Sequence, residues 1–243
     1  MTEKDTLFQN APAHGADFVF DERVVNVFPD MINRSVPGYT LVIQLIGLLA
    51  RRHVQAGSNV YDLGCSLGAA TLAMRQAVSA PGVTYIAVDN SAAMIKRFRQ
   101  RLEAEVETGA PVKCIEGDIC TTDICDASMS VLNFTLQFVR RAQREPLLRR
   151  IAEGTRTGGV LLLSEKICFS DEAEQDDQTT WHHDFKRAQG YSDLEIAGKR
   201  NALERVLQPD TEQEHLRRLK AAGFARVVRC FQAFNFVTYL AFR

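Results

Sequence analysis

The fold is decided by the stretch Val60-Tyr61-Asp62-Leu63-Gly64-Cys65-Ser66-Leu67-Gly68, in which a short apolar run ends in a turn with two glycines. Apolar residues at helical spacing follow over residues 69–78. Glycine allows the backbone to approach a ligand closely, and the first turn of a helix presents free N–H groups. The stretch therefore predicts a strand, a turn and a helix, with the turn beneath a ligand. A tight turn whose glycines serve packing alone has the same pattern, so both interpretations stay open here.

Five short apolar runs, of which residues 59–63 are the first, predict the strands of one sheet. The other four span residues 83–88, 112–115, 128–132 and 160–163, and helical patterns fall at residues 69–78, 92–106 and 141–153. This alternation builds βαβ units, in which helices cover both faces of a parallel sheet. We therefore expect an α/β fold with a mostly parallel, doubly wound sheet.

The flanking segments predict a helical cap at the N-terminus and an antiparallel strand at the C-terminus. Residues 37–53 have helical spacing with Pro37 in the first turn, and residues 1–35 interleave apolar residues with charge. Residues 171–207 form a charged helical insertion, and a helix over residues 211–222 closes at Gly223. The last apolar runs, 226–231 and 234–242, are so close that they pair antiparallel. We expect one domain over residues 1–243, with a cap at 1–55 and a Rossmann-like core at 56–243.

Composition limits the partners and the compartment. Of 243 residues, 46% are hydrophobic, and 29 basic residues balance 30 acidic ones, so a phosphate-binding surface for nucleic acid is not expected. The six cysteines form no paired pattern, which is typical of reduced thiols. The N-terminus has no continuous apolar segment, and the longest apolar run, residues 41–50, is interrupted by Gln44. We expect a cytoplasmic protein with no membrane anchor.

Polar residues that follow the second, third and fourth predicted strands are candidates for a nucleoside site. They are Asp89 and Asn90, then Asp118 and Ile119, and then Asn133. Ligands of open α/β sheets bind outside the carboxyl ends of the strands, where all these residues fall. An acid after the second strand suits ribose hydroxyls, and Asp118 suits an adenine amino group. Asp89 next to a helix start, or Asp118 as a loop acid, could equally serve the backbone alone.

Two other chemistries match parts of the sequence. Residues 64–68 fit G-x-S-x-G, the nucleophile elbow of serine hydrolases, with Ser66 as nucleophile, but such an elbow normally follows several strands. His182-His183-Asp184 suggests a metal site, yet adjacent histidines on a helix diverge and the i, i+4 pairing of a helical zinc site is absent. We expect no metal and rank the hydrolase below a nucleoside binder.

Longer motifs carry a family resemblance over most of residues 5–205. They include RSVPGY at 34–39, VYDLGCSLGAATL at 60–72, VLNFTLQF at 131–138, LSEK at 163–166, HHDFKRAQGYS at 182–192 and KRNALE at 199–204. With these motifs the chain resembles the carboxy-S-adenosyl-L-methionine synthases, which have the Rossmann-like class I methyltransferase fold. The resemblance weakens at residues 168–180 and after residue 208.

The resemblance implies an enzyme in which S-adenosyl-L-methionine is the substrate and prephenate the carboxyl donor. The products are carboxy-S-adenosyl-L-methionine and phenylpyruvate. A C–H beside a sulfonium is acidified, so its deprotonation gives an ylide that can capture carbon dioxide in a dry pocket. The family serves tRNA modification, in which a separate carboxymethyltransferase makes wobble uridine-5-oxyacetic acid, and it suggests a homodimer. An ordinary small-molecule methyltransferase is the alternative.

The resemblance also implies the ligand contacts. They are Tyr39, Gly64, Cys65, Ser66, Asp89, Asn90, Asp118, Ile119 and Asn133 for the nucleoside and methionine parts. Arg200 is implied as the catalytic partner of the new carboxylate, which a guanidinium can hold through two parallel hydrogen bonds. Nothing in composition or spacing singles out Arg200.

Overall fold

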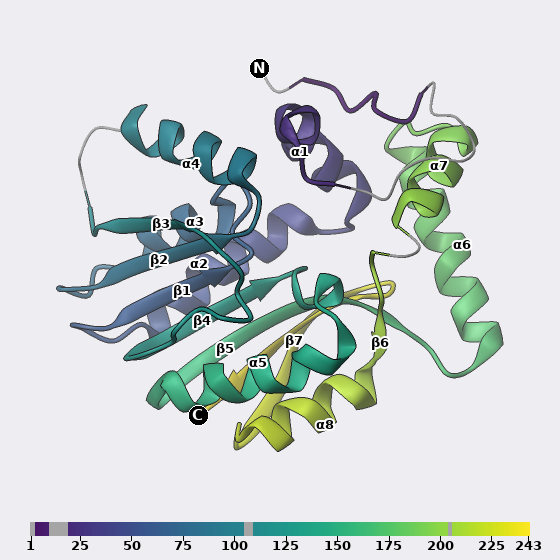
Figure 1. Ribbon diagram of the computed structural model, residues 1–243. Coiled ribbons are helices and arrows are strands. Elements are labelled where there is room, and N and C mark those ends of the chain that lie inside the picture. Colours follow the sequence, from purple (N-terminus) through teal and green to yellow (C-terminus); the bar gives the residue numbers. More distant parts are fainter. Residues whose placement is uncertain (1–2, 10–18, 105–108, 204–205) are drawn as a thin grey trace.

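A single mixed sheet organises the molecule (Figure 1). The computed structural model describes residues 3–9, 19–104, 109–203 and 206–243. Its strands are β1 (Asn59–Leu63), β2 (Thr84–Asp89), β3 (Val112–Glu116), β4 (Ala127–Asn133), β5 (Thr155–Cys168), β7 (Arg226–Ala233) and β8 (Phe236–Phe242), in the order β3-β2-β1-β4-β5-β8-β7. Strands β1 to β5 pair in parallel, whereas β8 is antiparallel to both β5 and β7. The expected α/β fold, with its antiparallel C-terminal strand, is confirmed.

Helices cover both faces of this sheet. One face carries α2 (Tyr39–His53), α3 (Ala69–Ala77) and α4 (Ala92–Ala104), and the other carries α5 (Arg141–Gly154) and α8 (Glu212–Ala222). The remaining helices, α1 (Glu22–Ser35), α6 (Glu172–Ala188) and α7 (Asp193–Leu203), lie beyond the sheet, at the top and the right of Figure 1. In the described part of the chain, no helix is long and apolar enough to span a membrane.

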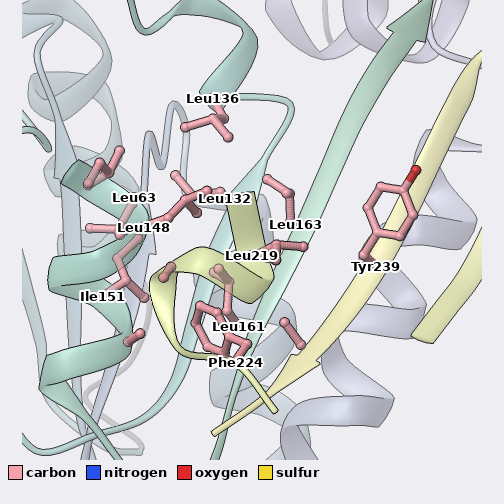
Figure 2. Packing of buried hydrophobic residues seen from close by; sticks show 14 of the residues in the cluster. Leu63, Leu132, Leu136, Leu148, Ile151, Leu161, Leu163, Leu219, Phe224 and Tyr239 are labelled. Atoms are coloured by element: carbon pink, nitrogen blue, oxygen red, sulfur yellow. The ribbon is translucent and has the colours of Figure 1, made fainter. Parts of the chain in front are cut away.

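The core consists of two apolar layers that the central strands separate. Figure 2 shows the layer beneath α5 and α8, where Leu148 and Leu219 pack towards Leu161 and Leu163 of β5. On the opposite face, Leu162 of β5 packs in the layer that includes α2 and α3. Consecutive residues of a strand point to opposite faces. A strand buried on both faces therefore has a continuous apolar run, which is why the sequence revealed these strands.

Several predicted boundaries were wrong. Helix α2 begins at Tyr39 with Gly38 as its N-cap, so Pro37 precedes the helix instead of occupying its first turn. Gly38 has a φ of 76°, and a Cβ there would overlap the ring of Phe231, so the chain turns sharply before the helix. The insertion at 171–207 is two helices, α6 and α7, separated at Gly190, whose φ is 84°.

Strand β5 is longer than predicted because polar residues continue it. The apolar run ends at Leu163, but Ser164, Glu165 and Lys166 still pair with β8. The short β6 (Asp210–Thr211), which pairs with the end of β5, was not predicted. Parts of the predicted cap, residues 1–2 and 10–18, and the ends of two predicted helical segments, at 105–106 and 204–205, lie outside the described residues.

Glu165 makes the stability of this core depend on pH. Its side chain is fully buried, one carboxyl oxygen accepts a hydrogen bond from Leu136 N at 2.9 Å, and the other has no partner among the described residues. Burial raises the pKa of Glu165 from 4.5 to about 8, although Arg144 opposes the shift. Between these two values the folded protein keeps a proton that the unfolded chain releases, so stability falls as pH rises.

Glu165→Gln is expected to remove this dependence, because glutamine resembles the protonated carboxyl. Between about pH 6 and about pH 8, the wild type should lose roughly 2–3 kcal/mol of unfolding free energy that the variant keeps. Urea unfolding at the two pH values measures the difference. Glu172→Gln, at an exposed position of α6, is the control and should follow the wild type. Parallel pH profiles for wild type and Glu165→Gln would contradict the assignment.

Candidate functional site

A cavity of about 530 Å³ lies outside the carboxyl ends of the central strands. Its volume is within the range of sites that bind a small molecule or cofactor. Residues of the loops after β1, β2, β3 and β4 line it, together with residues of α1, α2, α6 and α7. Nine of the ten residues predicted as ligand contacts are in this lining: Tyr39, Gly64, Cys65, Ser66, Asp89, Asn90, Asp118, Ile119 and Asn133.

The loop after β1 combines a packing role with its place in the cavity. Gly64 has a φ of 84° and Gly68 one of 76°, and added Cβ atoms would overlap Thr135 and Phe98 respectively. Gly64 N and Cys65 N both donate to the carbonyl oxygen of Val88 on β2, at 2.8 and 3.0 Å. Both glycines are therefore required by backbone conformation and packing, which agrees with the interpretation of this stretch as a tight turn. The same loop nevertheless forms part of the cavity wall.

Asp89 connects two loops of the site. One carboxyl oxygen accepts from Ser66 N at 2.8 Å, and the other accepts from Ser91 N at 2.9 Å. The side chain is 9% exposed, and burial raises the pKa of this carboxyl against the effect of both hydrogen bonds. Ser91 caps α4, because its Oγ accepts from Met94 N at 3.2 Å. Ser91, and not Asp89, is therefore the N-cap of α4, and Asp89 instead holds the loop at residues 64–68 beside the cavity.

Asp62 is a residue of the cavity wall that the sequence-based prediction did not select. Its carboxylate accepts from both Thr71 N at 3.0 Å and Thr71 Oγ1 at 2.6 Å, which joins β1 to the first turn of α3. Burial raises the pKa of Asp62 to about 6, and it also raises the pKa of Tyr39, to which Asp62 adds a further increase. Asp62 lies in the stretch at residues 60–68, near the carboxyl end of the first predicted strand, and this position alone could have indicated it.

The loops after β3 and β4 supply the remaining predicted contacts. Asp118 accepts a hydrogen bond from Cys120 N at 2.8 Å, so this carboxylate does serve the backbone of its own loop. Asp118 also lines the cavity. Asn133 lies at the end of β4, and its Oδ1 is buried without a hydrogen-bond donor among the described residues. A buried amide oxygen normally has a donor, so a ligand or water is needed to complete this site.

The serine hydrolase arrangement is not found among the described residues. Ser66 has the positive φ, 47°, that strained elbows show, but no hydrogen bond joins its hydroxyl to a described histidine. His182 Nε2 is 2.8 Å from the carbonyl oxygen of Ser35, and its ring packs on Phe236. Burial is the main cause that lowers the pKa of His182, to about 2, so its imidazole is neutral. Within the described ranges, no cluster of three potential ligands could hold a metal ion.

Arg200 is the one predicted contact that the structure does not bring to the cavity. It is exposed on α7, whereas its neighbour Lys199 is buried and lines the cavity. Consecutive helix residues point about 100° apart, so one face of α7 can bury only one of the two. Within one chain, Arg200 therefore lies outside the cavity lining, and its role stays a prediction.

Three lysines in the cavity wall were missed by the sequence-based prediction. Lys166 lies on β5, Lys186 on α6 and Lys199 on α7, and all three line the cavity. Lys199 Nζ is 2.8 Å from Ser35 Oγ and 3.4 Å from a carboxyl oxygen of Asp5. The motifs LSEK and HHDFKRA contain the first two, but a lysine in a charged helix or at the end of a strand is usually solvated.

Comparisons with known proteins define first the class and then the family. Residues 60–159 match a methyltransferase domain model. The structure resembles an O-methyltransferase family protein from Burkholderia thailandensis, with a TM-score of 0.66 and 15% identity over 92% of this chain and 60% of that chain. Human N-acetylserotonin methyltransferase, solved with S-adenosylmethionine, gives a TM-score of 0.58 and 16% identity over 91% and 55% of the two chains. The fold is thus the Rossmann-like fold of methyltransferases.

Closer relatives share the whole length of the chain. Carboxy-S-adenosyl-L-methionine synthase of Citrifermentans bemidjiense is 54% identical over 100% of both chains. The enzyme of the same name from an Enterobacter strain is 52% identical over 100% of this chain and 98% of its own. The chain therefore belongs to the carboxy-S-adenosyl-L-methionine synthase family.

Proposed function

We propose that this protein converts S-adenosyl-L-methionine to carboxy-S-adenosyl-L-methionine, with prephenate as the carboxyl donor. The observation that carries the proposal is that the chain matches synthases of this name over its full length at 54% identity. The cavity supports it, because nine residues expected from the family resemblance line one space of suitable size.

S-adenosyl-L-methionine would lie along the carboxyl ends of β1 to β4. Asp89 would accept hydrogen bonds from the ribose hydroxyls, and the backbone bonds from Ser66 and Ser91 already hold its carboxylate in position. Asp118 and Ile119 would contact the adenine, and the unpartnered Oδ1 of Asn133 would accept a donor of the ligand. The loop at residues 64–66 and Tyr39 would enclose the methionine part.

The proposed reaction forms one C–C bond and leaves the sulfonium intact. Prephenate loses carbon dioxide from its ring, and its ring hydroxyl leaves with the proton taken from the S-methyl group, as water. The methyl carbon then bonds to the carbon dioxide, and the remaining organic product is phenylpyruvate. The apolar part of the cavity wall, which includes Phe134 and Phe236, would keep bulk water from the deprotonated methyl carbon.

Mass spectrometry of the reaction mixture tests the proposal. Purified protein with S-adenosyl-L-methionine and prephenate should yield a nucleoside heavier than the substrate by one carbon dioxide, together with an equal amount of phenylpyruvate. Methyl transfer from labelled S-adenosyl-L-methionine to an added acceptor, without the heavier product, would favour the ordinary methyltransferase instead. The cellular role we propose is supply of this product, in the cytoplasm, to a separate tRNA carboxymethyltransferase.

Arg200 keeps a place in the proposal only if a second copy of the chain brings it to the cavity. A homodimer in which α7 of one copy reaches the other would do so, since Arg200 is exposed on α7. Arg200→Ala is then expected to lose the carboxylated product while S-adenosyl-L-methionine affinity changes less than about threefold, because the guanidinium contacts only the new carboxylate. Arg200→Lys keeps the positive charge but loses the two parallel hydrogen bonds, so its yield of carboxylated product should lie between those of the wild type and Arg200→Ala.

Mass spectrometry of the ligand retained after purification measures the effect of Arg200→Ala. Equal loss of both nucleosides would contradict the role, because it would mean that the substitution disturbs the shared nucleoside site. Mixing Arg200→Ala with an Asp89→Ala variant tests the dimer: if each copy supplies one residue, mixed dimers should regain part of the activity that both variants lack.

A further inference from the structure

Two cations at the α6 end of the cavity have no counter-charge among the described residues. Lys186 is 8% exposed and lines the cavity from α6, and Lys166 lines it from the end of β5. Neither Nζ takes part in an ion pair or a hydrogen bond within the described ranges. The charged groups that act on Lys186 are Lys166 and Lys199, and burial together with these two cations lowers its pKa to about 7.

The neighbouring charges do not compensate these two lysines. Lys199 is already paired with Asp5, and Arg34 is paired with Asp30. His182, which also faces Lys166 and Lys186, is neutral. Two lysines therefore lack an opposite charge at this end of the cavity, and an anionic ligand would reverse the lowering of the Lys186 pKa and keep this lysine charged. Buried charges without partners are costly, and such an arrangement is retained where a ligand supplies the opposite charge.

An apolar surface lies beside the ammonium group of Lys166. Lys166 Nζ is 6.0 Å from the ring centroid of Phe236, and the ring of His182 packs on the same phenylalanine at 4.9 Å. Phe134 continues this surface, with its ring centroid 5.9 Å from that of Phe236. The polar nucleoside contacts, by contrast, are at the ends of β1 to β4. The cavity thus has a polar end and a second end that is apolar and positively charged.

We infer that Lys166 and Lys186 form the subsite for the second substrate, a small dicarboxylate whose apolar ring packs on Phe236 while its two carboxylates meet the two ammonium groups. This inference rests on the proposed function, in which prephenate, a ring with two carboxylates, is the carboxyl donor. It extends that function by assigning the donor to particular residues, and it predicts that a dianion binds more tightly than a monoanion.

Kinetics with prephenate and S-adenosyl-L-methionine test the subsite. Lys186→Met and Lys166→Met should each raise the KM for prephenate about 10-fold or more, the loss expected for one charge-assisted hydrogen bond. The Kd of S-adenosyl-L-methionine, measured by calorimetry, should change less than about twofold, because its contacts lie at the other end. Lys220→Met, on the exposed side of α8, is the matched control and should leave both constants unchanged.

Thermal melting separates a binding role from a structural one. Methionine removes a buried amino group that has no partner among the described residues, so Lys186→Met should melt at a higher temperature than the wild type while binding prephenate more weakly. A lysine that serves the fold would show the opposite, a lower melting temperature with an unchanged KM for prephenate, and this result would overturn the inference.

Equilibrium binding keeps the test independent of turnover. Calorimetric titration of the S-adenosyl-L-methionine complex with prephenate, and with the monoanion phenylpyruvate, should show the larger loss for prephenate in the Lys166→Met/Lys186→Met double variant. If the wild type binds prephenate through these lysines but forms no carboxylated product, the proposed reaction is wrong and the subsite stands. If the product forms and both lysines are dispensable for prephenate binding, the subsite is wrong and the proposed reaction stands.

Discussion

Asp210→Ala is expected to lower the free energy of unfolding by about 3–5 kcal/mol, the range found when one partner of a buried ion pair is removed. Asp210 is 7% exposed, and one of its carboxyl oxygens accepts from both Arg144 and Arg218. Arg144 is completely buried and Arg218 is 6% exposed. Alanine at this position would leave Arg144 buried without its carboxylate partner, while Arg218 would keep only Glu214, at 3.0 Å.

The same cluster supports one wall of the cavity, so the substitution should also reduce binding. Arg144 donates to the carbonyl oxygens of Val139, Gln137 and Gln208, at 2.8, 3.0 and 2.9 Å. Gln137 lies in the short helix η1 (Leu136–Phe138), and Val139 directly follows it. Both residues line the cavity. Once Arg144 loses Asp210, these carbonyl contacts have no fixed donor, and the wall that they hold becomes less ordered.

Urea unfolding of Asp210→Ala measures the loss, with Glu145→Ala as the control. Glu145 also contacts two arginines, Arg149 at 3.3 Å and Arg217 at 3.1 Å, but both are more than half exposed. Removal of such surface pairs changes stability by about 0–1 kcal/mol. Equal losses for the two variants would show that the buried cluster contributes no more than surface pairs.

Acid should weaken the Asp210 cluster in the wild type. Burial alone would raise the pKa of Asp210, but its hydrogen bond from Arg218 and the charge of Arg144 outweigh burial and hold the pKa below 3.8. The folded state therefore binds this proton less readily than the unfolded chain, so the contribution of Asp210 is complete above about pH 5 and is lost as pH falls below it.

The sheet and the polar strand ends could be predicted from the sequence because both depend on local patterns. Strands buried on both faces appear as apolar runs, and the carboxyl ends of parallel strands meet at one edge. Asp89, Asp118 and Asn133 follow such runs directly, which is why their common location was predictable. The family motifs added Tyr39, which reaches the cavity from the start of α2 and not from the sheet.

The rest of the site depends on contacts between segments that are distant in sequence. Lys186 faces the cavity only because α6 packs beyond the ends of the strands, and its spacing gives no sign of that position. Lys166 follows a buried carboxyl within a strand whose apolar run has already ended. The pairing of Arg144 with Asp210 spans 66 residues. Arg200 is exposed and outside the cavity of its own chain, and a motif does not specify which side of a helix faces the ligand.

Asp89→Ala is expected to weaken S-adenosyl-L-methionine binding at least about 100-fold, which corresponds to roughly 3 kcal/mol. Two losses add here. The ribose hydroxyls would lose a charged acceptor, and a charged hydrogen bond contributes about 1.5–3 kcal/mol. Ser66 N and Ser91 N would lose the carboxylate that holds them at 2.8 and 2.9 Å, so the loop at residues 64–68 would no longer be fixed before the ligand arrives.

A control must separate the loss of a ligand contact from the loss of a backbone acceptor. Asp171 also accepts a backbone hydrogen bond, from Glu174 N at 2.8 Å, but it is exposed at the start of α6 and outside the cavity lining. Asp171→Ala should cost about 1 kcal/mol of stability, as loss of an N-cap does, and leave the Kd of S-adenosyl-L-methionine unchanged. Asp89→Asn retains one acceptor oxygen without the charge and should fall between wild type and Asp89→Ala. If calorimetry instead gave Asp89→Ala and Asp171→Ala the same affinity for S-adenosyl-L-methionine, Asp89 would serve only the backbone, and the nucleoside would have to be held by the remaining strand ends.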